Sequence, residues 1–183
     1  PGPGYGGSCF PKDTHALVAM GQKNRSPLLT VEAAIKTNAS QKVRMVDKLK
    51  RLMGGSFKGK TVAVLGLAFK PQTDDVREAA SIVIVSNLAE SGATVQAYDP
   101  IAIDNFKNHF PNIQYFDSWQ DAVKNADACI LLTEWNEFRG MDLNKLKDLM
   151  KTPVLLDTKN IINIQGLESR GFTYDNVGRK SPS

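Results

Sequence analysis

Ala128-Cys129-Ile130-Leu131-Leu132-Thr133 is a run in which only the last side chain is polar. A strand with one face in water alternates polar and apolar side chains, whereas a strand covered on both faces shows no such alternation. The run therefore predicts a strand in the interior of a sheet that has helices on both faces. Thr61-Val62-Ala63-Val64-Leu65 is a second apolar run that predicts a strand.

Strands and helices alternate on either side of these two runs. Strands are expected at residues 61–65, 94–98, 113–116, 128–133, 154–156 and 172–174. Helices are expected between them at residues 80–91, 103–110, 119–125 and 143–150. Strands separated by helices form a parallel sheet with helices on both faces. The fold class is therefore α/β, with a doubly wound, mostly parallel, Rossmann-like sheet domain.

A long connecting helix is predicted ahead of this domain. Ser26-Pro27 suits the N-cap and first residue of a helix, and Gly54-Gly55 suits its end. A helix from Pro27 to Met53 would be roughly 40 Å long at about 1.5 Å per residue. Its apolar residues recur every three or four positions, at Val31, Ile35, Ala39, Val43, Val46, Leu49 and Met53. This apolar face predicts either the core of a helical domain or an interface between two copies of the chain.

The composition is typical of a globular protein, with 42% hydrophobic and 23% charged residues. No apolar run approaches the roughly 18 residues of a membrane span, so no membrane partner is expected. The net charge of +4 comes from scattered basic residues, which does not favour binding to nucleic acid. Cys9 and Cys129 form no CxxC pair, which favours a reducing compartment such as the cytoplasm.

The first residues contain a candidate reactive thiol. In Gly4-Tyr5-Gly6-Gly7-Ser8-Cys9-Phe10-Pro11-Lys12-Asp13 the glycines allow the backbone to approach a bound group closely. Pro11 suits the first turn of a helix, so Cys9 would lie just ahead of a helix N-terminus and beside Lys12. Both features stabilise a thiolate. Two interpretations stay open here, an activated nucleophile or a small buried residue in a glycine-rich turn.

Candidate ligand-binding residues follow two of the strands. Ligands of doubly wound sheets bind beyond the carboxyl ends of the strands. Phe69, Lys70 and Arg77 follow the strand at 61–65, and Lys159 follows the strand at 154–156. Phe69 offers a flat face and the lysines offer charges for phosphate, which favours an anionic nucleotide.

Other polar residues near this edge receive structural interpretations. Asp99 is expected in a turn with Pro100, because the loop after the first strand lacks the GxGxxG fingerprint of a dinucleotide site. Asp74 and Asp75 have no further metal ligands nearby and Arg77 is a ready partner for an ion pair, so no metal site is expected. Asn38 and Thr133-Glu134-Trp135 are likewise assigned structural roles.

Two segments resemble signatures of the UDP-glucose/GDP-mannose dehydrogenase family. One is the cysteine segment, residues 4–13, and the other is Val64-Leu65-Gly66-Leu67-Ala68-Phe69-Lys70-Pro71 with Thr73-Asp74-Asp75-Val76-Arg77-Glu78. The resemblance implies a C-terminal half. Residues 1–56 would end a central helical domain and include the dimerisation helix, and residues 57–183 would form a UDP-sugar-binding domain. A domain with GxGxxG would precede them in the whole protein.

The resemblance also implies an activity and its residues. The family oxidises the C6 alcohol of a nucleotide sugar to a carboxylate, a four-electron change that uses two NAD molecules. Cys9 matches the nucleophile that forms a thiohemiacetal and then a thioester, and Asp13 matches an aspartate that positions or activates water. Gly2, Tyr5, Gly6, Phe69, Lys70 and Lys159 match positions that bind the nucleotide sugar. Lys12 and Arg77 match positions that contact NAD.

Within the family, Ser8 and Phe10-Pro11-Lys12 favour UDP-glucose as the substrate. The N-acetyl-hexosaminuronate branch usually has histidine before the cysteine, and the GDP-mannose branch tends to have leucine after it. Lys159 replaces the arginine of many relatives, which argues against a bidentate phosphate contact there. The alternatives are another nucleotide sugar such as GDP-mannose, or a binding or assembly module without turnover. The resemblance further implies a homodimer formed through the long helix.

Overall fold

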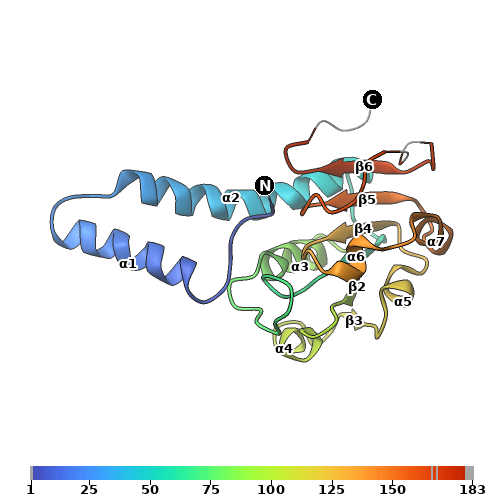
Figure 1. The fold of residues 1–183 in the computed structure, drawn as a ribbon, viewed down its shortest axis with the longest axis horizontal. Helices are drawn as coiled ribbons and strands as arrows, with labels where there is room; N and C mark the ends of the chain where they lie inside the picture. The colour runs from blue at the N-terminus through green and yellow to red at the C-terminus, as the bar shows by residue number, and fades with distance from the viewer. Residues whose placement is uncertain (1, 166, 168, 180–183) are drawn as a thin grey trace.

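The computed structural model describes residues 2–165, 167 and 169–179. The ends of the two predicted domains, Pro1 and residues 180–183, lie outside these residues. The chain begins with a glycine-rich loop and a helical hairpin, and continues into a sheet with helices on both faces (Figure 1). Within the described residues, no helix combines the length and the apolar character that a membrane span requires.

The hairpin consists of α1 (Phe10–Lys23) and α2 (Leu29–Leu52), and it projects from the sheet domain (Figure 1). The predicted N-cap at Ser26 is wrong, because α2 begins at Leu29 after Leu28 and has no side-chain cap. Ser26 instead helps to reverse the chain between the helices. Its amide donates to the carbonyl oxygen of Gly21 at 2.9 Å, and its own carbonyl would lie 2.7 Å from a Cβ at Gly21.

All six predicted strands are present and they pair in parallel. They are β1 (Thr61–Leu65), β2 (Thr94–Tyr98), β3 (Gln114–Tyr115), β4 (Ala128–Leu131), β5 (Val154–Asp157) and β6 (Thr173–Asn176). The strand order is β3-β2-β1-β4-β5-β6, so the direction of winding reverses between β1 and β4. This is the order of a doubly wound sheet, and the predicted fold class is confirmed.

Helices cover the two faces of the sheet separately. On one face lie α3 (Ala80–Glu90), α4 (Ile103–Lys107) and the C-terminal half of α2, and on the other lie α5 (Trp119–Val123), α6 (Asn136–Arg139) and α7 (Leu143–Leu149). The helix α6 was not predicted. Alternate residues of β1 serve the two cores, since Val62 and Val64 face the first and Ala63 and Leu65 the second.

The apolar face of α2 is buried near its C-terminal end and more exposed one turn earlier. Val46 and Leu49 are 5% and 0% exposed, in the core that α2 shares with α3 and with the sheet at β5 and β6. Val43, one turn earlier, is 42% exposed. Of the two interpretations of the stripe from Val31 to Met53, an interface between two copies is therefore wrong at the C-terminal end of the helix, because α3 and the chain's own sheet cover that part.

Candidate functional site

The loops after β1 and β4 meet at the point where the winding reverses. Gly66, directly after β1, has φ of +95°, and a Cβ there would lie 2.6 Å from the amide nitrogen of Thr133. The Thr133 hydroxyl donates to the carbonyl oxygen of Ala68 at 2.6 Å. A glycine is required at this position because only its missing side chain and its left-handed φ allow the two loops to touch.

Asp99 fixes the same edge from the end of β2. Its carboxylate is 1% exposed and accepts hydrogen bonds from the amides of Leu67 and Ala68 and from the indole of Trp135, at 2.7, 3.2 and 3.1 Å. The amides of residues 101 and 102 donate to its other oxygen, which agrees with the predicted turn. With this many protein donors, Asp99 acts as a structural carboxylate and is not free for a ribose.

The loop that leads to Cys9 packs against the segment that follows β1. The amide of Gly7 donates to the carbonyl oxygen of Arg77 at 2.9 Å. A Cβ at Gly7 would lie 2.8 Å from the ring of Phe69, and one at Gly6 would overlap the carbonyl of Glu78. Two adjacent glycines are therefore needed for the loop to lie this close to the sheet edge.

Polar side chains of α2 attach the other side of this loop and also the segment that follows β1. Asn38 Oδ1 accepts from the Tyr5 amide at 2.7 Å, and Asn38 Nδ2 donates to the Tyr5 carbonyl at 3.1 Å. Gln41 donates to the Gly2 carbonyl at 3.0 Å. Lys42 donates to the Glu78 carbonyl at 3.1 Å, and burial lowers the pKa of this lysine, an effect that the charge of Glu78 partly offsets. The structural role predicted for Asn38 agrees with these contacts, whereas Gln41 and Lys42 were not singled out in the sequence.

Cys9 is the N-cap residue of α1, as predicted, and its side chain is exposed. The alternative of a buried turn residue is therefore wrong. By contrast, Cys129 is fully buried, and burial followed by the nearby charge of Asp157 raises the pKa of its thiol.

The residues that follow Cys9 lie on the first turns of α1. Lys12 Nζ lies 3.5 Å from Asp13 Oδ1, and both side chains are largely exposed. A ring nitrogen of His15, Nδ1, lies 2.7 Å from the Pro11 carbonyl oxygen, so this histidine bonds to its own helix. Tyr5 packs edge-on against Phe10, with ring centroids 4.6 Å apart, which joins the loop to the start of α1.

The two lysines that were predicted to bind phosphate have different surroundings. Lys70 is exposed, and its Nζ lies 5.4 Å from the centroid of the Phe69 ring. Lys159 is largely buried, and its Nζ lies 2.6 Å from Oε2 of Glu134. Lys159 therefore already has an anionic partner, which the sequence analysis missed because Glu134 follows a different strand.

Arg77 pairs with Asp75, as the sequence suggested. Its Nε and Nη2 atoms donate to the two carboxylate oxygens at 2.9 and 2.8 Å, and these hydrogen bonds are the largest cause of a lowered pKa for Asp75. In the part of the chain that the structure describes, no cluster of three or more His, Cys, Asp or Glu side chains could hold a metal ion.

The residues that were predicted to contact NAD do not form a dinucleotide cradle. Lys12 is exposed, and Arg77 is occupied by Asp75. Thr133 occupies the space beside Gly66 at the turn after β1. The carboxylate of Asp99 already accepts hydrogen bonds from protein donors.

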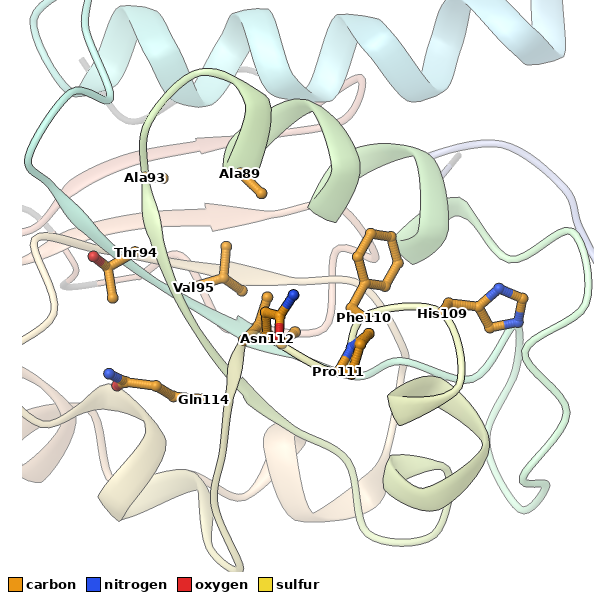
Figure 2. A pocket seen from close by; sticks show the side chains of 10 residues that line it. Ala89, Ala93, Thr94, Val95, His109, Phe110, Pro111, Asn112 and Gln114 are labelled. Carbon is orange, nitrogen blue, oxygen red and sulfur yellow. The ribbon is translucent and has the colours of Figure 1, made fainter.

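Two grooves lie in different parts of the molecule, and only one of them borders the glycine loop. One of about 680 Å³ lies between the glycine loop and the N-terminal half of α2. Its lining includes Gly2, Tyr5, Ala34 and Asn38. The other, of about 420 Å³, is bordered by the starts of β2 and β3 and includes Phe110 (Figure 2). The second groove lies at the amino ends of the strands and is lined by none of the predicted site residues.

A doubly wound parallel sheet with a thiol-bearing glycine loop against its switch point defines a Rossmann-like ligand-binding domain of the kind that dehydrogenases use. Two family descriptions match the chain, the "UDP-glucose/GDP-mannose dehydrogenase family, UDP binding domain" over residues 63–164 and the central domain of that family over residues 1–40. The chain belongs to the UDP-glucose/GDP-mannose dehydrogenase family.

Individual relatives agree with this assignment. UDP-glucose 6-dehydrogenase TuaD of Bacillus subtilis (strain 168) is 44% identical over 97% of this chain, and UDP-glucose 6-dehydrogenase of Rhizobium meliloti (strain 1021) is 43% identical over 97%. The chain spans only 39% and 41% of the lengths of these two proteins.

Solved structures resemble the fold closely. A UDP-glucose dehydrogenase from Pyrobaculum islandicum matches with a TM-score of 0.79 and 32% identity, over 87% of this chain and 35% of that one. An NDP-N-acetyl-D-galactosaminuronic acid dehydrogenase from Methanosarcina mazei Go1 matches with a TM-score of 0.86 and 26% identity, over 98% of this chain and 39% of that one.

Proposed function

We propose that the chain is the C-terminal part of an NAD-dependent UDP-glucose 6-dehydrogenase, in which it binds the nucleotide sugar and supplies the catalytic thiol. The observation that carries the proposal is the position of the exposed Cys9 on a glycine loop that packs against the carboxyl edge of β1. The names of relatives at 44% and 43% identity support UDP-glucose as the substrate. Residues 1–56 end the central domain, and residues 57–183 form the UDP-sugar-binding domain.

Contacts to the nucleotide sugar come from both sides of this edge. The loop residues Gly2, Tyr5 and Gly6 border the ligand on one side. Phe69 supplies an apolar surface, and Lys70 and Lys159 supply positive charge for the diphosphate. The exposed position of Lys70 leaves its three ammonium donors accessible to phosphate oxygens.

Cys9 acts in the second of two oxidations, when the sugar C6 is an aldehyde. Its thiolate adds to the carbonyl carbon, the C=O electron pair moves to oxygen, and this oxygen takes a proton. The adduct loses a hydride from C6 and the hydroxyl proton to become a thioester, and water cleaves the thioester to a carboxylate and the free thiol. Asp13, one turn into α1, positions that water. NAD is the hydride acceptor when it is bound to the whole enzyme, and Lys12 and Arg77 contribute contacts at its edge.

The whole enzyme is a homodimer that forms through α2, the long helix of the hairpin, and it works in the cytoplasm. Large apolar side chains that are exposed on this hairpin support an interface there: Phe10, Leu17, Met20, Leu29 and Val43. The free thiols of Cys9 and Cys129 support a reducing compartment.

Calorimetry on this chain tests the binding function directly. UDP should bind more tightly than uridine, because the lysines act on the phosphates, and GDP should bind more weakly than UDP. Lys70→Ala should weaken UDP binding by about 1.5–3 kcal/mol, the range for hydrogen bonds to charged groups. Equal affinities for UDP and uridine would contradict the proposal.

A measurement of turnover distinguishes the proposed enzyme from a binding module that has no catalytic activity. In the whole protein, Cys9→Ser should lower the steady-state rate of UDP-glucose oxidation by orders of magnitude and leave UDP-glucose binding nearly unchanged, because serine has no low-pKa anion. Normal turnover of this variant would show that Cys9 is not the nucleophile.

A further inference from the structure

The ion pair of Glu134 and Lys159 lies where the loops after β4 and β5 meet, at the edge where the nucleotide sugar is proposed to bind. Lys159 Nζ lies 2.6 Å from Glu134 Oε2, and the two side chains are 18% and 32% exposed. Lys159 Cδ lies 4.0 Å from the position of a Cβ on Gly2. The pair therefore lies against the start of the glycine loop.

Buried threonines fix the backbone just before each charged residue. The hydroxyl of Thr133 donates to the Ala68 carbonyl and that of Thr158 to the Leu131 carbonyl, both at 2.6 Å. The amide of Lys159 also donates to the fully buried Asp157 at 3.0 Å. Both loops are attached in this way, so a phosphate that binds Lys159 in this position lies close to the Glu134 carboxylate.

This arrangement makes the local charge close to neutral. The Glu134 carboxylate cancels most of the charge of Lys159 and is itself a fixed negative charge near the proposed diphosphate position. A nucleotide sugar carries about two negative charges on its diphosphate, whereas a free nucleoside diphosphate carries about three at neutral pH, because its terminal phosphate loses a second proton near pH 6. Each added negative charge is repelled by a fixed carboxylate in a partly buried site.

We propose that Glu134 is a specificity-determining residue, which makes the site favour a diphosphate that is esterified at both ends over a nucleotide with a free terminal phosphate. This inference rests on the proposed function, since it needs the nucleotide sugar at this edge. The ion pair lowers the affinity for every anion, and it does so most for the most highly charged. UDP-glucose is thereby favoured over UDP, which shares its nucleoside and both phosphates.

Calorimetric titrations of this chain with UDP and with UDP-glucose test the proposal. Glu134→Gln keeps the shape of the side chain and removes its charge. It should tighten UDP binding by about tenfold and UDP-glucose binding by about fivefold, because the repulsion that is removed scales with about three and about two negative charges. Glu134→Ala, which removes the charge without adding an amide, should change the ratio of the two affinities in the same direction.

Glu137→Gln is the matched control. Glu137 lies on α6 and accepts a hydrogen bond from the Tyr98 hydroxyl at 3.0 Å, which glutamine can also accept. This variant changes the net charge by the same amount, but Glu137 is paired with Tyr98 and not with Lys159. It should therefore change either affinity by less than twofold.

Two results would overturn the inference. Equal tightening of UDP and UDP-glucose would show that Glu134 does not discriminate between them, and weaker binding of both would show that it only positions Lys159. Failure of the proposed function is a separate result, because the unmodified chain would then bind UDP no better than uridine.

Discussion

Asn38 makes both main-chain hydrogen bonds of Tyr5, accepting from its amide at 2.7 Å and donating to its carbonyl at 3.1 Å. The residues are 33 positions apart in the sequence, and this contact joins the glycine loop to α2. Because Tyr5 precedes the two glycines that pack on the sheet edge, the side chain of Asn38 helps to set the shape of the loop that presents Cys9.

Asn38→Ala should therefore lower the free energy of unfolding by about 1–3 kcal/mol, the range for leaving polar groups unsatisfied, and should weaken UDP-glucose binding. Urea unfolding and calorimetry measure the two effects. Asn87→Ala is the control, since Asn87 also bonds a backbone carbonyl, that of Val83 on α3, and should not affect binding. Unchanged binding by Asn38→Ala would show that the loop keeps its shape without this contact.

Val43 and Val46 distinguish the interface of the proposed dimer from the core. Val43 is 42% exposed and Val46 is 5% exposed, although they are neighbours on the same helix. Val43→Glu should shift the chain from dimer to monomer in sedimentation experiments and leave its unfolding midpoint nearly unchanged. Val46→Glu should instead unfold the chain or lower its stability by several kcal/mol, because it buries a charge. A monomeric unmodified chain at high micromolar concentration would contradict the dimer.

Much of the sheet could be predicted because its strands are short apolar runs with distinct breaks between them. The bounds of β1 and β2 agree with the prediction. The role of α2 could not be found in the same way, because an apolar stripe looks the same whether it packs on a sheet or on a second copy of the chain. Only the tertiary structure shows that Val46 and Leu49 contact the chain's own core.

The candidate residues could be proposed one by one from the sequence, but their contacts could not. Residue type and position after a strand made Phe69, Lys70 and Lys159 candidates for ligand binding. Hydrogen bonds between residues that are far apart in the sequence, such as those of Asn38 and Asp99, leave no local pattern. The ion pair of Glu134 with Lys159 depends on the neighbouring positions of β4 and β5, which follow from the strand order and not from either segment alone.

Tyr98 should make the fold sensitive to alkaline pH. Burial, with a smaller contribution from the hydrogen bond to Glu137, raises the pKa of Tyr98 to about 12. An unfolded tyrosine loses its proton near pH 10, so between about pH 10 and 12 the folded state binds more protons than the unfolded state. The stabilisation is complete below pH 10 and is lost as the pH rises toward 12.

Tyr98→Phe should remove this dependence, so that the loss of unfolding free energy from pH 9 to pH 11 becomes smaller by about 1 kcal/mol. Urea unfolding at the two pH values gives the difference. Burial also raises the pKa of Tyr115 to about 12, so Tyr115 should account for part of the loss of unfolding free energy that remains. An identical pH dependence in the variant and the unmodified chain would show that Tyr98 ionises at the same pH in both states.

The two cysteines should differ strongly in their reaction with iodoacetamide. Cys9 is exposed at the N-terminus of α1, whereas Cys129 is fully buried in β4 and its thiol pKa is raised by that burial. Since the thiolate is the reactive form and must be accessible, the native chain should gain one label, on Cys9, and the second only after unfolding. Cys9→Ser should abolish the fast labelling, as mass spectrometry of the intact chain would show.

UDP-glucose should slow the labelling of Cys9, because the proposed sugar position lies at this thiol. Fast labelling of Cys129 in the native chain would contradict the buried position of β4, and equal labelling of Cys9 with and without UDP-glucose would argue against a sugar bound beside it.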